Sequence, residues 1–216
     1  MSTLSELLPS GGGGSTVDFV ASGTLPNGNP VILKADGTVE VVSGAVLSTT
    51  AIPAGSEYVF NSATSNYLSI SFDPNSTGKF VIAYTDAGNS SFGTAVVGTV
   101  SGTTISFGSE YVFNASASAH NFISFDPNTA GKFVIAYRDS GNSYYGTAIV
   151  GTVSGTSISF GSEYVFNSGD SSALSISFDP NTAGKFVIAY TDVGNGYYGT
   201  AVVGTISGTT ISFGSE

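Results

Sequence analysis

Three short stretches carry the residue types that could bind a polar ligand. Each reads Asp-x-Gly-Asn followed by aromatic residues, and they span residues 86–92, 139–145 and 192–198. Carboxylates and amides form directional hydrogen bonds, and an aromatic ring offers a flat apolar surface for stacking. In the alternative interpretation, Asp and Asn only hold a turn and the rings pack between sheets. The nine candidate ligand-binding residues are Asp86, Asn89, Phe92, Asp139, Asn142, Tyr145, Asp192, Asn195 and Tyr198.

No arrangement of residues in the sequence predicts a catalytic centre. His120 is the only histidine, and the chain has no cysteine, which excludes Cys-His pairs, disulfides and thiolate metal sites. One carboxylate in each Asp-x-Gly-Asn stretch is fewer than the about six to eight oxygen ligands that Ca²⁺ takes. We therefore expect no enzyme activity, no metal site and no cofactor.

A second acidic pattern, Ser-x-Asp-x-Asn-x-x-Gly, occupies Ser71–Gly78. It loosely resembles the Asp-box turn of sialidase-like propellers, although it lacks the Gly after the Asp and the closing Trp. The resemblance implies a site with several arginines, and this chain has only Arg138. We therefore interpret Asp73, Asp126 and Asp179 as turn residues.

The composition is typical of a β-rich protein with few charges. Charged residues make up 9% of the chain against 41% hydrophobic residues, and 29 glycines fit short strands joined by tight turns. The formal net charge of −10 argues against a nucleic-acid partner, because phosphate contacts need Lys and Arg. No apolar run approaches the roughly 18–20 residues of a membrane helix, so we expect no membrane insertion.

A 53-residue repeat organises most of the chain. Gly-Ser-Glu-Tyr-Val-Phe-Asn begins at Gly55, Gly108 and Gly161, which defines repeats 55–107, 108–160 and 161–213. The first repeat predicts strands over residues 68–72, 79–84, 93–100 and 104–113. In the last of these we expect Ile105, Phe107, Tyr111 and Phe113 to share a face. An Asp-Pro-Asn turn and a Ser-Gly hairpin join antiparallel neighbours.

The repeat predicts an all-β fold made of four-stranded antiparallel blades, as in a β-propeller. A string of independent small β units along a fibre is the alternative. Known propellers have about four to eight blades, and the three blades predicted here are fewer. We expect either a longer polypeptide with further repeats, which we favour, or several chains that complete one ring.

The links between strands differ most among repeats at one edge of the predicted blades. These links are residues 62–67, 115–121 and 168–173, together with the three Asp-x-Gly-Asn stretches. Binding residues are commonly found on loops held by a rigid scaffold, so this edge is where we expect a ligand.

Two further segments precede the repeats in the predicted organisation. Residues 1–15 read as an arm with a Gly-rich linker, residues 16–50 as a small β module, and residues 51–216 as the repeat region. Within the module we expect strands over 17–21, 30–33 and 38–42, with a hairpin turn at 35–37. Its pattern ASGTLPNGNPVILKADGTVEVV resembles a β module of phage capsid-decoration and other virion proteins, which implies docking on a larger particle.

The repeats GSEYVFN…SFDPNTAGKFVIAY resemble those of marine-phage virion structural proteins of the tail-fibre or appendage kind. The resemblance implies a non-enzymatic virion surface protein, located on the virion and therefore extracellular, that binds host-surface glycan. Its expected partners are other virion proteins and further copies of itself in a homo-oligomer. A capsid-decoration or head-fibre protein is the first alternative, and an extracellular glycan-processing enzyme is the second.

Overall fold

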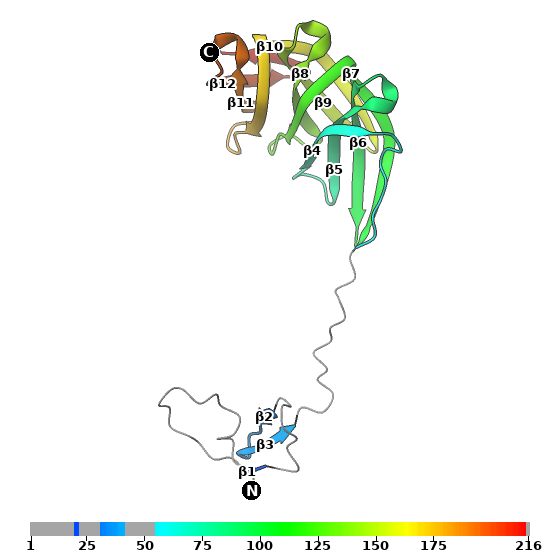
Figure 1. Ribbon diagram of the computed structural model, residues 1–216, viewed down its shortest axis with the longest axis vertical. Helices are drawn as coiled ribbons and strands as arrows, with labels where there is room; N and C mark the ends of the chain where they lie inside the picture. Colours follow the sequence, from blue (N-terminus) through cyan, green and yellow to red (C-terminus); the bar gives the residue numbers. More distant parts are fainter. Residues whose placement is uncertain (1–19, 22–30, 42–54, 215–216) are drawn as a thin grey trace. The chain divides into compact units, whose positions relative to one another are not determined.

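The computed structural model describes residues 20–21, 31–41 and 55–214. The chain divides into two units, Met1–Ala54 and Gly55–Glu216 (Figure 1). The predicted arm and linker over residues 1–15 lie outside the described residues, as does most of the strand predicted over residues 17–21. Among the described residues, no helix is long and apolar enough to cross a membrane.

The N-terminal unit contains a three-stranded sheet in the order β1–β3–β2. Its strands are β1 (Val20–Ala21), β2 (Val31–Leu33) and β3 (Thr38–Val41). Strands β2 and β3 are antiparallel, and the N–H of Lys34 donates to the carbonyl of Thr38 across the turn at 2.8 Å. Gly37 has a φ of +80°, a left-handed conformation that glycine adopts without a Cβ clash. The hairpin predicted at residues 35–37 is therefore confirmed.

The C-terminal unit is a large antiparallel sheet of ten strands that follow one another in chain order (Figure 1). The all-β prediction is confirmed, and a strand occupies each position predicted in the first repeat. Strands β4 and β13 are the two ends of the order, so the described strands do not form a closed ring. The ten strands are β4 (Ser65–Phe72), β5 (Lys79–Asp86), β6 (Phe92–Ser101), β7 (Thr104–Phe125), β8 (Lys132–Asp139), β9 (Tyr145–Ser154), β10 (Ser157–Phe178), β11 (Lys185–Asp192), β12 (Tyr198–Ser207) and β13 (Thr210–Phe213).

Strands β7 and β10 are each 22 residues long and change partner along their length. The first part of β7 pairs with β6 as far as Ala117, and the second part pairs with β8 from Ser118 onward. The prediction of loops at 115–121 and 168–173 is therefore wrong, because the backbone there continues as strand while it exchanges one partner for the next. The first repeat sheet consists of β4, β5, β6 and the first part of β7. The second repeat sheet consists of the rest of β7, β8, β9 and the first part of β10. The third repeat sheet consists of the rest of β10, β11, β12 and β13.

The prediction that the four apolar residues of residues 104–113 share one face is also wrong, because the strand contains a bulge. Ile105 and Phe107 pack with the cluster around Phe80, whereas Tyr111 and Phe113 pack with the cluster on the opposite face of the first repeat sheet. Between these pairs, β7 has one residue more than β6, since Gly98 pairs with Phe107 but Val96 pairs with Glu110. An extra residue reverses the alternation of side chains, so the two halves of the strand face opposite ways.

The core lies between repeat sheets that pack face to face. Each sheet presents Val and Ala on one face and Phe, Ile and Tyr on the other. At the seam between the first and second repeat sheets, Val81 and Ala83 join Phe133, Ile135 and Tyr137 in one buried cluster. The seam between the second and third sheets repeats this packing with Val134, Ala136, Phe186, Ile188 and Tyr190. Small side chains thus meet large ones at both seams.

The Asp-Pro-Asn turns also join neighbouring repeats. In the first turn, Asp73 accepts the N–H of Asn75 at 2.9 Å with one oxygen, which confirms its predicted turn role. The other oxygen accepts the N–H of Gly131 in the next repeat at 3.1 Å. Asp126 makes the same bond to Gly184 at 3.0 Å. Both carboxylates are buried, so they tie the repeats together as well as shaping the turns.

Candidate functional site

The Asp-x-Gly-Asn stretches fold as short 3-10 turns, named η2 (Ala87–Asn89), η3 (Ser140–Asn142) and η4 (Val193–Asn195). The carboxylates of Asp86 and Asp139 each accept the N–H of the glycine two residues on, at 2.9 Å. Asp192 precedes η4 without such a bond. All three carboxylates are buried, and those of Asp86 and Asp139 fix the turn that follows.

The remaining candidate residues are more open to a ligand. Asn89, Asn142 and Asn195 end the three turns and are exposed. Phe92 and Tyr145 are partly buried where the next strand begins, whereas Tyr198 is 66% exposed. Each Asp pairs with the aromatic residue of its own repeat across the antiparallel strands. The structure therefore groups the nine residues by repeat and does not gather them into one site.

The 3-10 turns and the residues that follow them lie beside the variable segments 62–67 and 168–173, as the edge prediction requires. The N–H of Ala87 donates to the carbonyl of Thr64 at 3.0 Å. The N–H of Ser171 donates to the carbonyl of Tyr144 at 3.2 Å, one repeat further along. Since both kinds of segment meet through backbone bonds, they form one continuous surface, which we call the turn edge.

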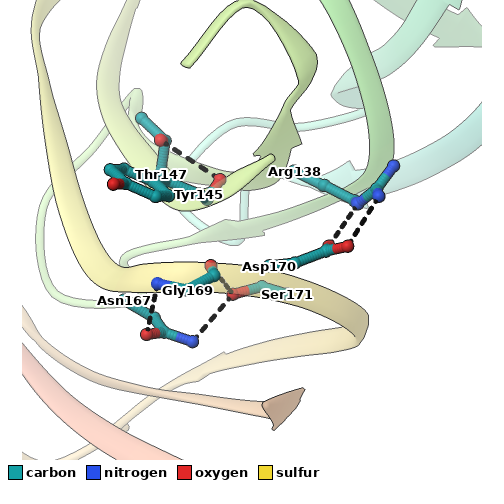
Figure 2. A network of polar contacts seen from close by, with 7 residues as sticks. All are labelled: Arg138, Tyr145, Thr147, Asn167, Gly169, Asp170 and Ser171. Atoms are coloured by element: carbon teal, nitrogen blue, oxygen red, sulfur yellow. Dashed lines mark hydrogen bonds and ion pairs between the residues drawn. The ribbon is translucent and has the colours of Figure 1, made fainter. Parts of the chain in front are cut away.

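Arg138 and Asp170 form an ion pair on the turn edge that the sequence analysis did not single out. Figure 2 shows the guanidinium facing the carboxylate, with N–O distances of 2.7 and 3.0 Å. Both side chains keep part of their surface exposed. The guanidinium carbon also lies 4.0 Å from the ring centroid of Tyr144, within the range of a cation–π contact. A charged pair and an exposed aromatic ring thus share one location.

A network of hydrogen bonds fixes the backbone on either side of Asp170 (Figure 2). The side chain of Asn167 accepts the N–H of Gly169 at 2.9 Å and donates to the hydroxyl of Ser171 at 3.1 Å. That hydroxyl donates in turn to the carbonyl of Gly169 at 3.3 Å. The backbone on both sides of Asp170 is therefore fixed, which preorganises the carboxylate toward Arg138.

The electrostatics follow from this geometry. The hydrogen bond from Arg138 lowers the pKa of the Asp170 carboxyl, and the same bond raises the pKa of the Arg138 guanidinium. Burial lowers the pKa of His120, and the positive charge of Arg138 lowers it further, against a smaller opposite effect of Asp170. The pair is therefore fully ionised at neutral pH, and its field extends to His120.

His120 and Tyr67 extend the turn edge across the first seam. Their ring centroids are 5.2 Å apart, and their φ values are +51° and +50°. Ala173, at the matching position of the next repeat, has a φ of +47°. Left-handed backbone is unfavourable for side chains of this size, and such strain clusters at functional sites. In each repeat it coincides with a bulge in the strand.

The corresponding location at the first seam is neutral. There the hydroxyl of Thr85 donates to the carbonyl of Ser118 at 2.8 Å and accepts from the amide of Asn121 at 2.9 Å. Thr85 matches Arg138 in the repeat, and Ala117 matches Asp170. A column-by-column comparison of the repeats would have revealed the charged pair as the departure from an otherwise uniform pattern.

The described residues hold no cluster of three or more His, Asp or Glu side chains that could bind a metal ion. Asp86, Asp139 and Asp192 belong to separate repeats, and each carboxylate lies beside its own turn. The chemistry that the turn edge offers is hydrogen bonding, ion pairing and stacking.

Comparisons with known proteins give little further guidance. No protein-family model matches the chain, and no curated protein matches it. Among solved structures, the crystal structure of Sqt1 from Saccharomyces cerevisiae aligns with 74% of this chain at 14% sequence identity and a TM-score of 0.48. The chain spans 37% of the length of that protein.

Proposed function

We propose that the chain is a non-enzymatic binding protein whose turn edge recognises a glycan. The observation that supports this proposal most directly is the Arg138–Asp170 pair beside Tyr144 on that edge. Sugars combine adjacent hydroxyl groups with an apolar face of C–H groups. A charged donor–acceptor pair suits the hydroxyls, and an exposed aromatic ring suits the apolar face.

The pair has unused hydrogen-bonding capacity. A guanidinium carries five N–H donors, and two of the nitrogens of Arg138 are engaged by Asp170. A carboxylate can accept about four hydrogen bonds, so Asp170 can also accept a hydroxyl while it holds the arginine. A preorganised, partly exposed pair of this kind can bind a polar ligand without first breaking its own contact.

The repeat sheets supply the rigid support, and we propose that they are blades of a propeller-like array. Support comes from the four strand segments in each repeat and from the face-to-face seams. The setting we propose is a virion appendage, supported by the resemblance of the repeats to tail-fibre-type proteins. Other virion proteins and a host-surface glycan are then the partners.

The experiment is glycan-array binding by the full chain and by a variant matched to its own repeats. Arg138→Thr with Asp170→Ala places at the second seam the residue types, Thr85 and Ala117, that occupy the matching positions at the first seam. Thr85 shows that threonine at this position finds a backbone acceptor, so the fold should persist. We expect wild-type protein to bind a restricted set of glycans and the double variant to lose at least tenfold in affinity.

Two controls define the outcome. Tyr197→Ala removes a side chain that is 71% exposed on the same edge, and Thr103→Ala alters an exposed hairpin at the opposite edge. The first should weaken binding if the third repeat also contacts the glycan, and the second should leave it unchanged. Equal binding by wild type and the double variant would refute the site. Turnover of a glycan would replace a binding function with an enzymatic one, and immunogold labelling of capsid instead of tail would favour a decoration protein.

A further inference from the structure

The first and third repeat sheets each expose an apolar face of the kind that is buried at the two internal seams. In the third repeat sheet, the Val and Ala face corresponds to the faces that are buried in the first two sheets. Val187 is 43% exposed, whereas Val134 at the matching position is fully buried. Val203 and the alanines beside it are likewise open. Nothing in the described part of the chain covers this face.

The other half lies on the first repeat sheet. In β4, Leu68, Ile70 and Phe72 are exposed, and the first two line an apolar hollow. Ile70 is 57% exposed, whereas Ile123 at the matching position of β7 is 7% exposed. In the interior repeats these positions face the Val and Ala surface of the preceding sheet. The exposed residues of β4 therefore correspond to the large residues, Ile123 and Phe125, that pack on the Val and Ala face at the first seam.

The segment Gly55–Asn61 already occupies the position of a strand from a preceding repeat. The ring centroid of Phe60 lies 5.1 Å from that of Tyr84, the same distance as between Phe113 and Tyr137. The amide of Asn61 donates to Asp86 at 3.1 Å, as Asn114 does to Asp139 at 3.0 Å in the next repeat. Yet Gly55–Asn61 is not part of any strand, whereas the identical stretches at 108–114 and 161–167 pair with the strand before them.

Strand β12 offers the missing partner. It pairs with β13 only from Gly204 to Ser207, so the edge of its first half is open among the described strands. Gly199 has open space where a side chain would stand, whereas a Cβ on the matching Gly146 would meet the ring of Phe166 at 2.4 Å. The socket that a phenylalanine fills in the second repeat sheet is empty in the third.

Polar groups match as well. At both seams a lysine donates to a hairpin carbonyl of the following repeat, Lys79 to Gly155 and Lys132 to Gly208, each at 2.8 Å. By the same spacing, Lys185 corresponds to these two lysines, and the carbonyl of Gly102 corresponds to their acceptors. Asp179 would likewise meet the N–H of Gly78, as Asp126 meets Gly184.

We infer that the third repeat sheet of one chain binds the first repeat sheet and the Gly55–Asn61 segment of a second copy, in a head-to-tail contact that reproduces the internal seams. Residues Tyr58, Val59 and Asn61 of the second copy then pair with Ala201, Thr200 and Gly199, the register that the first repeat sheet shows. Two copies joined this way at both ends contain six repeat sheets, within the about four to eight of closed radial arrays. This inference does not depend on the ligand of the turn edge.

The experiment measures the mass of the 216-residue chain in solution by light scattering after size exclusion, over a range of concentrations. We expect a dimer, and longer head-to-tail assemblies would support the same contact. Val187→Asp should shift the protein to monomer, with at least a tenfold weaker association. Val165→Asp is the matched control, since Val165 is equally exposed but lies away from the contact. A monomeric wild type, or equal association of the two variants, would overturn the inference.

A mixing experiment separates a head-to-tail contact from a symmetric one. Phe60→Ala removes the ring from the first end of the repeat region, and Val187→Asp blocks the second end. Each variant alone should be monomeric, but a mixture of the two retains one intact contact and should form mixed dimers. Failure to form mixed dimers, with both variants folded by circular dichroism, would contradict the head-to-tail arrangement. A dimer held by one surface meeting itself predicts that failure.

Discussion

Replacing Asp126 with alanine tests whether the Asp-Pro-Asn turns join the repeats or only shape their own hairpins. The carboxylate of Asp126 accepts two backbone N–H groups, from Asn128 within the turn at 2.9 Å and from Gly184 of the next repeat at 3.0 Å. The carboxylate of Asp179 keeps the turn bond, to Asn181 at 2.9 Å, and among the described residues it makes no hydrogen bond to another repeat. The two positions therefore differ by one buried contact.

The magnitude follows from that difference. A hydrogen bond to a charged group contributes about 1.5–3 kcal/mol, and its loss here leaves the buried N–H of Gly184 without an acceptor. An exposed turn bond contributes about 1 kcal/mol. We therefore expect Asp126→Ala to lower the free energy of unfolding by about 3 kcal/mol and Asp179→Ala by about 1 kcal/mol.

The assay is urea unfolding followed by tyrosine fluorescence, at protein concentrations low enough to keep the chain monomeric. Asp73→Ala serves as a replicate, because Asp73 makes the same contact to Gly131 at the first seam. Equal costs for Asp126→Ala and Asp179→Ala would refute the reasoning, since the contact between repeats would then add nothing to the turn.

Three further perturbations have defined outcomes. Gly146→Ala should cost about 1–3 kcal/mol in urea unfolding, because the new Cβ would overlap a phenylalanine ring, whereas Gly199→Ala, with open space, should change stability by less than about 0.5 kcal/mol. Burial, and then a hydrogen bond from its hydroxyl to a glutamate, raise the pKa of Tyr137 in the folded protein. The unfolded chain therefore releases this proton first, and wild type should lose more stability above about pH 10 than Tyr137→Phe does. The lowered pKa of Asp170 gives a contribution present above about pH 4 and lost as the pH falls through that lowered value. The difference in melting temperature between wild type and Arg138→Thr with Asp170→Ala should therefore shrink in acid, and a constant difference would contradict the assignment.

The periodic parts of the fold could be predicted because the same turn and strand patterns recur in each of the three repeats. Turn chemistry at Asp73 and the alternation of the strand Lys79–Asp86 both fix local geometry, and three copies of each pattern reinforce the same interpretation. The bulge in β7 could not be predicted, because it depends on how the residues around Gly108 fit the partner strand. The wrong face for Tyr111 and Phe113 follows from that one extra residue.

The candidate site shows a similar division. The Asp-x-Gly-Asn stretches could be interpreted as turns, and the buried Asp86 and Asp139 hold backbone groups of their own turns. The pair of Arg138 and Asp170 joins residues 32 positions apart, on β8 and on β10 just before β10 changes partner from β9 to β11. Local spacing carries no information on such a contact, since only the pairing of strands distant in the sequence brings these two side chains together.

The most direct test of the proposed binding edge is the affinity of the strongest array ligand, measured by titration calorimetry. Wild-type protein and Arg138→Thr with Asp170→Ala should have the same circular dichroism spectrum, so a difference in affinity reports on the pair alone. We predict that the double variant binds more weakly, with a Kd at least tenfold higher. An unchanged Kd would contradict the assignment of the turn edge around Arg138 as the site where this protein binds its ligand.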